Sequence, residues 1–555
     1  MDEIALKILW DRLVSIANEA SFVLKRSAFS TLVRECNDFA CTLLTLDGET
    51  LAIADASLPS FSTTQTITLR ALLEVYPAED WAPGDVLISN DPWIGTGQVM
   101  DLTLFKPVFK NGRLVAFTGS VAHSPDLGGI QRWNGAKDVF EEGMFIPPMH
   151  LYRRGRRNET LFSLIKANSR IPDETVGDLM AQIASHEVGE RRLLQVMAEH
   201  SLDDLTELSA EIFSRSEDAI RSAIAALPDG DYCYAMLADG SSGDLYQSKG
   251  ETGSLATITV NTAVRVRGSE IEVDFTGSSP QVSPPINSVF PFTYAYAAYA
   301  LRLILVPFLP QNGGFLRPMH VIAETGTVMN ATYPSPTLNR GIMGHLVCDS
   351  IFAALSDVLP ERVRAMSGST PLWQLILIGE DDSGCPYQRI LQLNGGLGAT
   401  AGSDGVVCSF PANLTNVPIE IMELTTPITC LKKEILTDSP GAGRRRGGYG
   451  VHWIFRAREP TIYSMTFNRI RNPPQGLLGG ASSRPGKVVH NGQALQPGAE
   501  GVLQAGDVLE VETPGGGGHG SPHERTRSLT ERDLASGIIS ADQAATAYGI
   551  EPCQP

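Results

Sequence analysis

The sequence predicts an α+β protein built from several domains. Its 555 residues exceed the size, about 250–300 residues, at which a single hydrophobic core usually stops growing. Hydrophobic residues make up 43% of the chain and charged residues 19%, which is ordinary for a globular protein with ample core. Segments of alternating apolar residues, typical of strands, occur beside segments with helical spacing. We therefore expect an N-terminal sheet with hairpins, a central helical segment and a β-rich, Gly-rich C-terminal region.

The same patterns divide the chain into four regions. No low-complexity tract or flexible linker separates them, so we expect the regions to be interwoven. The predicted divisions are an N-terminal α+β domain at 1–155, a helical segment at 156–230, a central α+β domain at 231–390, and a Gly-rich β region with two terminal helices at 391–555.

Local signals predict the individual helices and hairpins. The segment 39–55 alternates around Asp47-Gly48, a dipeptide that favours a hairpin turn. Pro172 interrupts the helical spacing that follows Asn158, so the second region should hold three or four helices. Further helices are predicted at 3–28, 64–76, 289–306 and 341–359, and two strands at 257–279.

Charge and hydropathy exclude some classes of partner. A formal net charge of -18 opposes binding to a nucleic-acid backbone, which requires a basic surface. The chain starts with acidic residues and an amphipathic helix, unlike a signal peptide. Arg302 and Pro307 interrupt the longest apolar stretch, which is too short to span a bilayer. We expect a cytoplasmic protein that binds neither nucleic acid nor membrane.

The stretch NDPWIGTGQVMDLTLFKPVFKNGRLVAFTGSVAHSPDLGG, residues 90–129, combines a predicted hairpin with two candidate metal ligands. Asp101 precedes the turn at Asn111-Gly112 and His123 follows it. Aspartate and histidine are common ligands of zinc, manganese and iron. They can share an ion only on one face of the sheet, and a plain two-residue turn would place Asp101 opposite Ala122 instead. A metal site therefore requires a three-residue loop with a glycine bulge, or another one-residue irregularity.

Two interpretations of this hairpin stay open on the residues alone. In the first, Asp101 and His123 bind a metal ion; in the second, Asp101 caps a strand and His123 is an ordinary hydrogen-bonded polar residue. Other motifs add little, because HExxH, GxSxG and Walker loops do not occur, and His519 and His523 share a loop with Gly520 and Pro522. The eight cysteines are scattered and are predicted to be reduced core residues.

Three Gly-rich runs occupy residues 394–405, 439–450 and 513–522. They are either tight turns or stretches of backbone that approach a ligand or partner closely. Ordering four successive glycines costs conformational entropy, which argues against a run with no structural or functional role. In the second run, Arg444, Arg445 and Arg446 form either an anion or subunit contact or a solvated basic turn.

Several blocks of the chain resemble the hydantoinase B/oxoprolinase family, the second subunit of ATP-dependent cyclic-amide hydrolases, whose module also occurs in acetone and acetophenone carboxylases. The resemblance extends over essentially the whole chain. The matching blocks are VRECNDFACTLLTLDGETLA, GDVLISNDPWIGTGQVMDLTLFKPVF, AHSPDLGG, EGMFIPPMHLYRRGRRNETLFSLIKANSR, DETVGDLMAQIA, VDFTGSSPQV, NGGFLRP, GAGRRRGGYG and VETPGGGGHGSP.

The resemblance implies a divalent metal (Mn, Zn or Mg) and indicates which residues would be its ligands. Family members usually carry T-H-x-x-D or G-H-x-x-D after N-D-P, then A-H-x-x-D, and these His and Asp residues look like metal ligands in the carboxylases. Carried onto this sequence, the positions are Gln98, Asp101 and His123. Glutamine thus stands in place of histidine, and its neutral amide oxygen suits hard ions better than zinc. Asp38 is a further candidate ligand, and Asp126 joins Asp101 and His123 as a candidate catalytic residue.

The resemblance also implies a division of labour in a hetero-oligomer. A hydantoinase A-type ATPase subunit would bind ATP and phosphorylate a small cyclic amide, and this chain would hydrolyse the activated ring. Asn90 and Asp91 would shape the site, since the proline that follows holds Asp91 extended. One alternative is a subunit of an acetone- or acetophenone-type carboxylase. Another is a non-catalytic scaffold that stabilises its partner.

Overall fold

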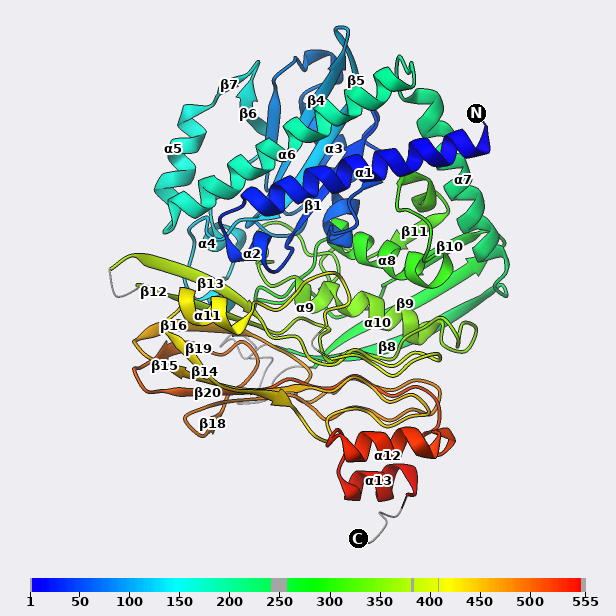
Figure 1. The fold of residues 1–555 in the computed structure, drawn as a ribbon, viewed down its shortest axis with the longest axis vertical. Helices are drawn as coiled ribbons and strands as arrows, with labels where there is room; N and C mark the ends of the chain where they lie inside the picture. The colour runs from blue at the N-terminus through cyan, green and yellow to red at the C-terminus, as the bar shows by residue number, and fades with distance from the viewer. Residues whose placement is uncertain (1, 241–256, 381–383, 408, 551–555) are drawn as a thin grey trace.

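A seven-stranded N-terminal sheet carries the predicted hairpin. In the computed structural model, which describes residues 2–240, 257–380, 384–407 and 409–550, its strands pair in the order β2-β1-β5-β4-β3-β6-β7. Helices α1 (Glu3–Ser27) and α6 (Pro172–Glu199) lie side by side across one face (Figure 1). Helix α3 (Pro59–Val75) packs on the other face. The strands are β1 (Phe39–Leu44), β2 (Thr50–Ile53), β3 (Val86–Ser89), β4 (Asp101–Lys110), β5 (Arg113–His123), β6 (Met149–Arg153) and β7 (Arg156–Arg157).

The β4–β5 hairpin contains the irregularity that a shared site requires, but not at its turn. Asn111 and Gly112 form a two-residue turn with φ angles of 52° and 82°, so of the two expected options the three-residue loop is absent and the other one-residue irregularity is present. The register instead shifts between Val108 and Phe109, where Val115 of β5 has no partner on β4. This one extra residue places Asp101 directly opposite His123.

Most of the remaining predicted elements are confirmed. The helical segment holds α5 (Glu159–Asn168), α6 and α7 (Thr206–Ala225), and the fold is mixed α+β, with four sheets among the described residues. The helix predicted at 341–359 is shorter and interrupted: α9 (Gly341–Gly344) and α10 (Leu346–Ala354) meet at His345. The central region further contains β8 (Gly230–Asp239), β9 (Thr257–Arg267), β10 (Glu270–Asp274), α8 (Phe290–Leu305) and β11 (Met319–Ile322).

Two packed sheets form the C-terminal region below the N-terminal layers (Figure 1). Their strand orders are β13-β12-β16-β19 and β14-β15-β20-β17-β18. The elements are β12 (Gln374–Glu380), β13 (Pro386–Gln392), α11 (Ile419–Thr425), β14 (Ile428–Ile435), β15 (Val451–Ala457), β16 (Thr461–Thr466), β17 (Lys487–His490), β18 (Gln493–Ala494), β19 (Glu500–Leu503), β20 (Val508–Glu512), α12 (Arg527–Ala535) and α13 (Ala541–Tyr548).

The hydrophobic cores cross the predicted divisions of the chain. One core joins Val121 of the N-terminal sheet to Ile220, Val264 and Phe410, so it draws on all four regions. A second core does the same. Interwoven packing of this kind was expected from the lack of linkers, and the residue boundaries at 155, 230 and 390 stay predictions. Among the described helices, none combines the length and apolar character needed to cross a membrane.

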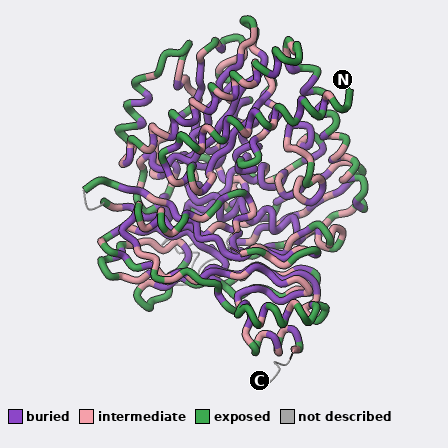
Figure 2. The backbone as a smooth tube through the Cα atoms, viewed as in Figure 1, coloured by how far each residue is buried: buried purple, intermediate pink, exposed green. Residues whose placement is uncertain are grey.

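The Gly-rich runs pack against one another as a layer of extended backbone. Gly516 N–H donates to Gly448 O, and Gly448 N–H donates to Leu397 O. A Cβ added at Gly516 would lie 1.9 Å from Leu397 O, which is far inside van der Waals contact. Most residues of these runs are buried, although Gly402 and Ser403 are exposed. The backbone just before the terminal helices is mostly purple in Figure 2. The backbone that these runs approach closely is that of their own chain, and approach to a ligand or partner stays a prediction.

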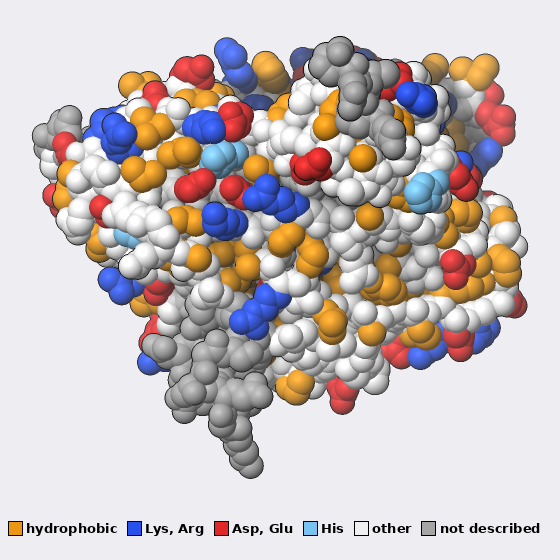
Figure 3. Space-filling model, turned by 90° about the horizontal axis from the view of Figure 1, so that it is seen from below, with side chains coloured by type: hydrophobic (Ala, Val, Ile, Leu, Met, Phe, Trp, Pro, Cys, Tyr) orange, Lys and Arg blue, Asp and Glu red, His pale blue; other side chains and the backbone are white. Residues whose placement is uncertain are grey.

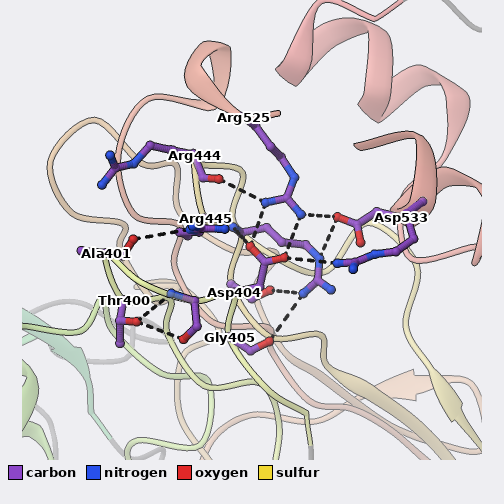
Figure 4. A network of polar contacts seen from close by, with 12 residues as sticks. Thr400, Ala401, Asp404, Gly405, Arg444, Arg445, Arg525 and Asp533 are labelled. Carbon is purple, nitrogen blue, oxygen red and sulfur yellow. Dashed lines mark hydrogen bonds and ion pairs between the residues drawn. The ribbon is translucent and has the colours of Figure 1, made fainter. Parts of the chain in front are cut away.

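Arg446, which lies within the second Gly-rich run, helps to anchor the C-terminal helices. Arg446 Nε lies 3.0 Å from Asp533 Oδ2 on α12, and Arg525 contacts Asp533 and Asp404 at 2.6 and 2.8 Å (Figure 4). Arg446 and Asp533 are buried, so Arg446 forms an intramolecular anion contact and not a solvated turn. On the face shown in Figure 3, acidic and basic side chains of the described residues are interspersed.

We predict that Gly398→Ala destabilises the fold while Gly402→Ala, in the same Gly-rich run, does not. A Cβ at Gly398 would lie 1.7 Å from Ala365 O, whereas nothing lies within 4 Å of one at exposed Gly402. Overpacking of this kind costs about 1–3 kcal/mol or more. Urea denaturation of both variants tests this, and equal midpoints would contradict the packed backbone layer.

Candidate functional site

Asp101 and His123 meet at one end of the β4–β5 hairpin. Asp101 opens β4 and His123 closes β5, and Asp101 Oδ1 lies 3.0 Å from His123 Nδ1. Both side chains are buried. Because the one-residue irregularity aligns them on the same face of the sheet, their pairing is a consequence of strand register.

Two more of the predicted residues join this pair. Gln98, just before β4, places Nε2 2.6 Å from Asp101 Oδ1 and 2.8 Å from His123 Nδ1. Asp38, just before β1, has Oδ2 3.9 Å from His123 Nδ1, and its backbone carbonyl accepts a hydrogen bond from the His123 N–H. The structure thus brings Asp38, Gln98, Asp101 and His123 into one buried cluster.

Asp126 lies outside this cluster and is engaged elsewhere. Its Oδ1 is 2.7 Å from Arg170 Nη1, and its Oδ2 accepts a hydrogen bond from the backbone N–H of the same arginine. Asp126 is fully buried and does not line the cavity beside the cluster. These contacts tie the loop after β5 to the segment before α6, and the catalytic role of Asp126 stays a prediction.

Arg340 is a member of the cluster that the sequence analysis did not identify. Its Nη2 lies 2.8 Å from Asp101 Oδ2, and its Nε donates to Thr96 O at 2.5 Å. The Thr96 hydroxyl donates to the same Asp101 oxygen. Arg340 comes from distant sequence, immediately before α9. The available signal was an arginine at the head of the apolar segment 341–359.

The hydrogen bonds among Gln98, Asp101 and His123 cannot all be satisfied at once. If His123 Nδ1 carries a proton, it faces the Gln98 amide N–H group at 2.8 Å; if it does not, its lone pair faces Asp101 Oδ1 at 3.0 Å. Exchanging the amide atoms of Gln98 would place two oxygens 2.6 Å apart. Each arrangement leaves one pair of like groups in contact.

A divalent cation would remove this conflict. Ligands at about 2.1 Å and right angles lie about 3 Å from one another, close to the spacing of these three atoms. With the amide oxygen of Gln98 turned inward, the three residues offer lone pairs and no opposing protons. Asp38 is the nearest further carboxylate. The residues therefore fit the expected metal in kind and in spacing, and the metal itself stays a prediction.

The charges of the cluster perturb one another. Burial raises the pKa of the Asp38 carboxyl to about 6. Burial acts in the same direction on Asp101, but Arg340 and His123 together hold the pKa of Asp101 below its usual range. Burial lowers the pKa of His123, yet its hydrogen bond to Asp101 and the charge of Asp38 hold that pKa above its usual value. Asp101 is thus the carboxylate most firmly kept ionised.

A cavity of about 50 Å³ adjoins the cluster. Asp38, Gln98, His123 and Arg340 form its polar side. By this measure a single water needs about 10–15 Å³, so the cavity has room for a small group of atoms. The rest of its wall is Leu58, Ser60, Phe61, Trp133, Phe292, Tyr296, Leu338, Asn339, Gly341, Ile342, His345, Leu372, Gln374, Gln392, Leu414 and Thr466.

Asn90 supports the loop that carries Gln98. Its Oδ1 accepts from the Ile146 N–H at 2.6 Å, and its Nδ2 donates to Val99 O and Met144 O. Asp91 accepts a hydrogen bond from the Trp93 N–H. Both residues hydrogen-bond to the backbone near the cluster, and their influence on a functional site stays a prediction.

Other histidines do not assemble a comparable site. His519 is buried, and its Nε2 lies 3.1 Å from Pro360 O, whereas His523 is exposed in a 3₁₀ turn. Among the described residues, three His or acidic ligand atoms come within 4.8 Å of one another only at His452, Glu510 and Glu512. That group lies on the C-terminal sheet, and Arg484 already neutralises Glu512 at 2.7 Å.

Comparison with known proteins identifies the family. The family model for hydantoinase B/oxoprolinase matches residues 2–522. A putative D-/L-hydantoinase B chain from Pseudomonas sp. (strain NS671) is 29% identical over 99% of this chain and 95% of that protein. The chain therefore belongs to the hydantoinase B/oxoprolinase family.

Two solved structures share the fold. The ATP-dependent caprolactamase from Pseudomonas jessenii matches with a TM-score of 0.88 and 26% identity, covering 100% of this chain and 97% of that one. An acetone carboxylase in its nucleotide-free form matches with a TM-score of 0.86 over 99% of this chain and 79% of that one. Its identity is 18%, so this second match shows the fold alone.

Glu142 is a further buried carboxyl, next to Leu338 of the cavity wall. Burial raises the pKa of Glu142 to about 8, although its Oε1 accepts hydrogen bonds from the N–H groups of Thr337 and Leu338. Between pH 4.5, the ordinary pKa of a glutamate, and about pH 8, the unfolded chain loses this proton while the folded chain keeps it. The free energy of unfolding therefore falls as the pH rises through that window.

Glu142→Gln should remove this pH dependence, since an amide oxygen accepts the same two bonds without ionising. We expect the Tm of the variant and of the wild type to agree at pH 5 and the variant to melt higher at pH 8, by differential scanning calorimetry. A difference independent of pH would contradict a protonated Glu142.

Proposed function

We propose that this chain is the second, hydantoinase B-type component of an ATP-dependent cyclic-amide hydrolase, in which it opens the C–N bond of a ring activated by its partner. The observation that carries the proposal is the cluster of Gln98, Asp101, His123 and Asp38 at the wall of a small cavity, in a chain that belongs to this family throughout. A buried acid–base cluster beside such a cavity is what hydrolysis of a small substrate requires.

Gln98, Asp101 and His123 would hold the cation, and Asp38, whose Oδ2 lies 3.9 Å from His123 Nδ1, would stay outside this ligand set. A bound divalent cation supplies Lewis-acid chemistry and lowers the pKa of water. The neutral amide of Gln98 favours Mg²⁺ or Mn²⁺ over zinc. Within the chain, Arg340 and Thr96 fix the second oxygen of Asp101, which orients the carboxylate and keeps it ionised.

Asp38 is the group in the cluster best placed to take a proton from attacking water. It lines the cavity, and its nearest ionic partner, His123, is 3.9 Å away, whereas both oxygens of Asp101 are engaged by neighbouring donors. A carboxylate with free lone pairs can serve as a general base. The water oxygen bonds to the activated carbonyl carbon and its proton passes to Asp38, the C–N bond then breaks as the nitrogen takes up a proton, and a second water releases the phosphoryl group from the resulting acyl phosphate as inorganic phosphate.

The partner would be an ATPase of the hydantoinase A type in a cytoplasmic hetero-oligomer. Support comes from the relatives, since one is named as the B component of a hydantoinase and the caprolactamase is described as ATP-dependent. The described residues show no phosphate-binding loop followed by a helix of the Walker type, and ATP would bind to the partner.

Co-purification of the chain with its ATPase partner tests the proposal. The complex should hydrolyse ATP and open a ring with at least one of hydantoin, 5-oxoproline or a lactam. ATP turnover only with acetophenone or acetone and bicarbonate would favour the carboxylase alternative. Lack of turnover with all of these substrates would contradict both enzymatic hypotheses.

We predict that Asp101→Asn lowers kcat at least about 100-fold while the complex still assembles. The amide keeps the shape of the carboxylate but removes the charge that Arg340 and the cation require. Size-exclusion chromatography measures assembly and product assays measure kcat. Unchanged kcat would instead support a scaffold role for this chain.

Gln98→His should change which cation the chain holds. An imidazole in place of the amide adds a nitrogen ligand, which shifts preference from Mg²⁺ or Mn²⁺ toward Zn²⁺. Elemental analysis after competitive loading with Mn²⁺ and Zn²⁺ measures the ratio, with His452→Ala in both backgrounds to remove the group on the C-terminal sheet. A ratio unaffected by Gln98→His would contradict Gln98 as a ligand.

A further inference from the structure

The N-terminus of helix α3 meets the cavity beside the cluster without a cap. Its N-cap residue, Leu58, provides no side-chain acceptor, and Pro59 follows at the first helical position. The backbone N–H groups of Ser60 and Phe61 have no acceptor among the described residues, although both residues are buried and line the cavity. Buried helix ends normally have side-chain, water or ligand partners. Two donors at the positive end of this 17-residue helix are therefore left unpaired at the cavity wall.

Backbone hydrogen bonds hold this helix start next to the cluster. The Leu58 N–H donates to Phe39 O at 2.9 Å, and the His123 N–H donates to Asp38 O at 3.1 Å. The first turn of α3 and the end of β5 thus flank the same short segment at the start of β1. A ligand that contacts the cluster from the cavity therefore also reaches the first turn of α3.

A buried glutamine of the C-terminal sheet is a second unpaired group in the cavity lining. Gln392 ends β13, is 2% exposed, and lies opposite Gln374 of β12, which also lines the cavity. Its Oε1 has no hydrogen-bond partner among the described residues, so nothing in the chain fixes which end of the amide faces a ligand. Thr466 and Asn339, two other neutral lining residues, are by contrast bonded to each other at 3.2 Å. Gln392 is therefore free to turn its N–H group toward a ligand.

His123 has an unpaired nitrogen as well. Its Nε2 is buried without a hydrogen-bond partner, whereas its Nδ1 faces Asp101 and Gln98. When Nδ1 holds the cation, the imidazole proton stands on Nε2 and requires an acceptor. Because His123 lines the cavity, a ligand there can supply that acceptor.

The charge of the loaded cluster favours a negatively charged ligand. Asp38 and Asp101 contribute two negative charges, which Arg340 and a divalent cation together outweigh. The unpaired groups around the cavity are N–H donors, or can become so by turning an amide. Helix N-termini with free N–H groups are a common binding site for phosphate and other oxyanions.

We propose that the first turn of α3 binds the phosphoryl group of the activated ring through the N–H groups of Ser60 and Phe61. Gln392 and His123 Nε2 serve as further donors. The proposal rests on the function proposed above and adds a subsite to it, in which a tetrahedral oxyanion is held while the ring carbon lies at the cluster. The same donors hold the inorganic phosphate that the last step releases.

Inorganic phosphate and phenylphosphonate test the subsite, titrated into the full-length chain with Mg²⁺ by isothermal titration calorimetry. Both are tetrahedral oxyanions, and the phosphonate also carries a ring. We expect both to bind at one site, and the phosphonate at least as tightly as phosphate. Lack of phosphate binding would overturn the proposal. Binding of phosphate alone would overturn the assignment to a phosphoryl group attached to a ring.

A cap supplied by the chain itself should compete with the anion. Leu58→Asn places an uncharged acceptor at the N-cap, where it can bond to the N–H of Ser60 or Phe61. We expect phosphate binding to weaken at least tenfold, whereas Leu58→Ala, which offers no acceptor, should change it less than about twofold. Equal binding by both variants, with Tm values confirming folded protein, would overturn the role of the helix.

Two buried glutamines of β13 form a matched pair for the side-chain donor. Gln392→Met should weaken phosphate binding about threefold or more. Gln388→Met should leave it unchanged, since Gln388 donates to Pro125 O and does not line the cavity. Equal binding by the two variants would overturn Gln392 as a donor.

The subsite and the proposed hydrolase fail in different ways. Phosphate binding that is sensitive to Leu58→Asn, in a chain that opens no ring with its partner and ATP, would contradict the hydrolase and leave the oxyanion subsite intact. Ring opening that is unaffected by Leu58→Asn would overturn the subsite alone.

Discussion

Strand register is the constraint on which the site depends. Side chains alternate between the two faces of a sheet, so one residue more or less between Asp101 and His123 would send them to opposite sides. The unpaired Val115 in β5 supplies that residue, and the tight Asn111-Gly112 turn needs no distortion to do so. The neighbouring strand β1 then brings Asp38 to the same end, because Phe39 pairs with Ala122.

Burial makes this cluster energetically costly unless its charges are paired. Asp38, Asp101 and His123 are all removed from water, and unpaired charges there would be costly. Arg340 reaches Asp101 from the central region, which couples the N-terminal sheet to the segment that also carries His345. The interwoven cores serve the same end: they fix segments distant in sequence around one cavity. The conflict among three close polar groups is the feature that a bound cation would resolve.

Local patterns predicted the elements of the fold well, and non-local contacts less well. The amphipathic helix, the two hairpins and the helical segment follow from spacing and turn residues in the sequence. Resemblance, and not pattern, selected Gln98 and Asp38, and the structure places both beside Asp101 and His123. Arg340 was not predicted because nothing local in the sequence distinguishes a buried arginine from a solvated one. For the Gly-rich runs the sequence left tight turns and close approach to a ligand or partner open, and it did not predict that the runs pack against one another.

The central claim is that Gln98, Asp101 and His123 together bind a divalent cation. Anomalous diffraction at the manganese edge, from crystals grown with Mn²⁺, tests it most directly. The account predicts a peak within about 2.3 Å of Asp101 Oδ1, His123 Nδ1 and the Gln98 amide oxygen. A peak absent from this position, with Gln98 still donating its N–H to Asp101, would contradict it.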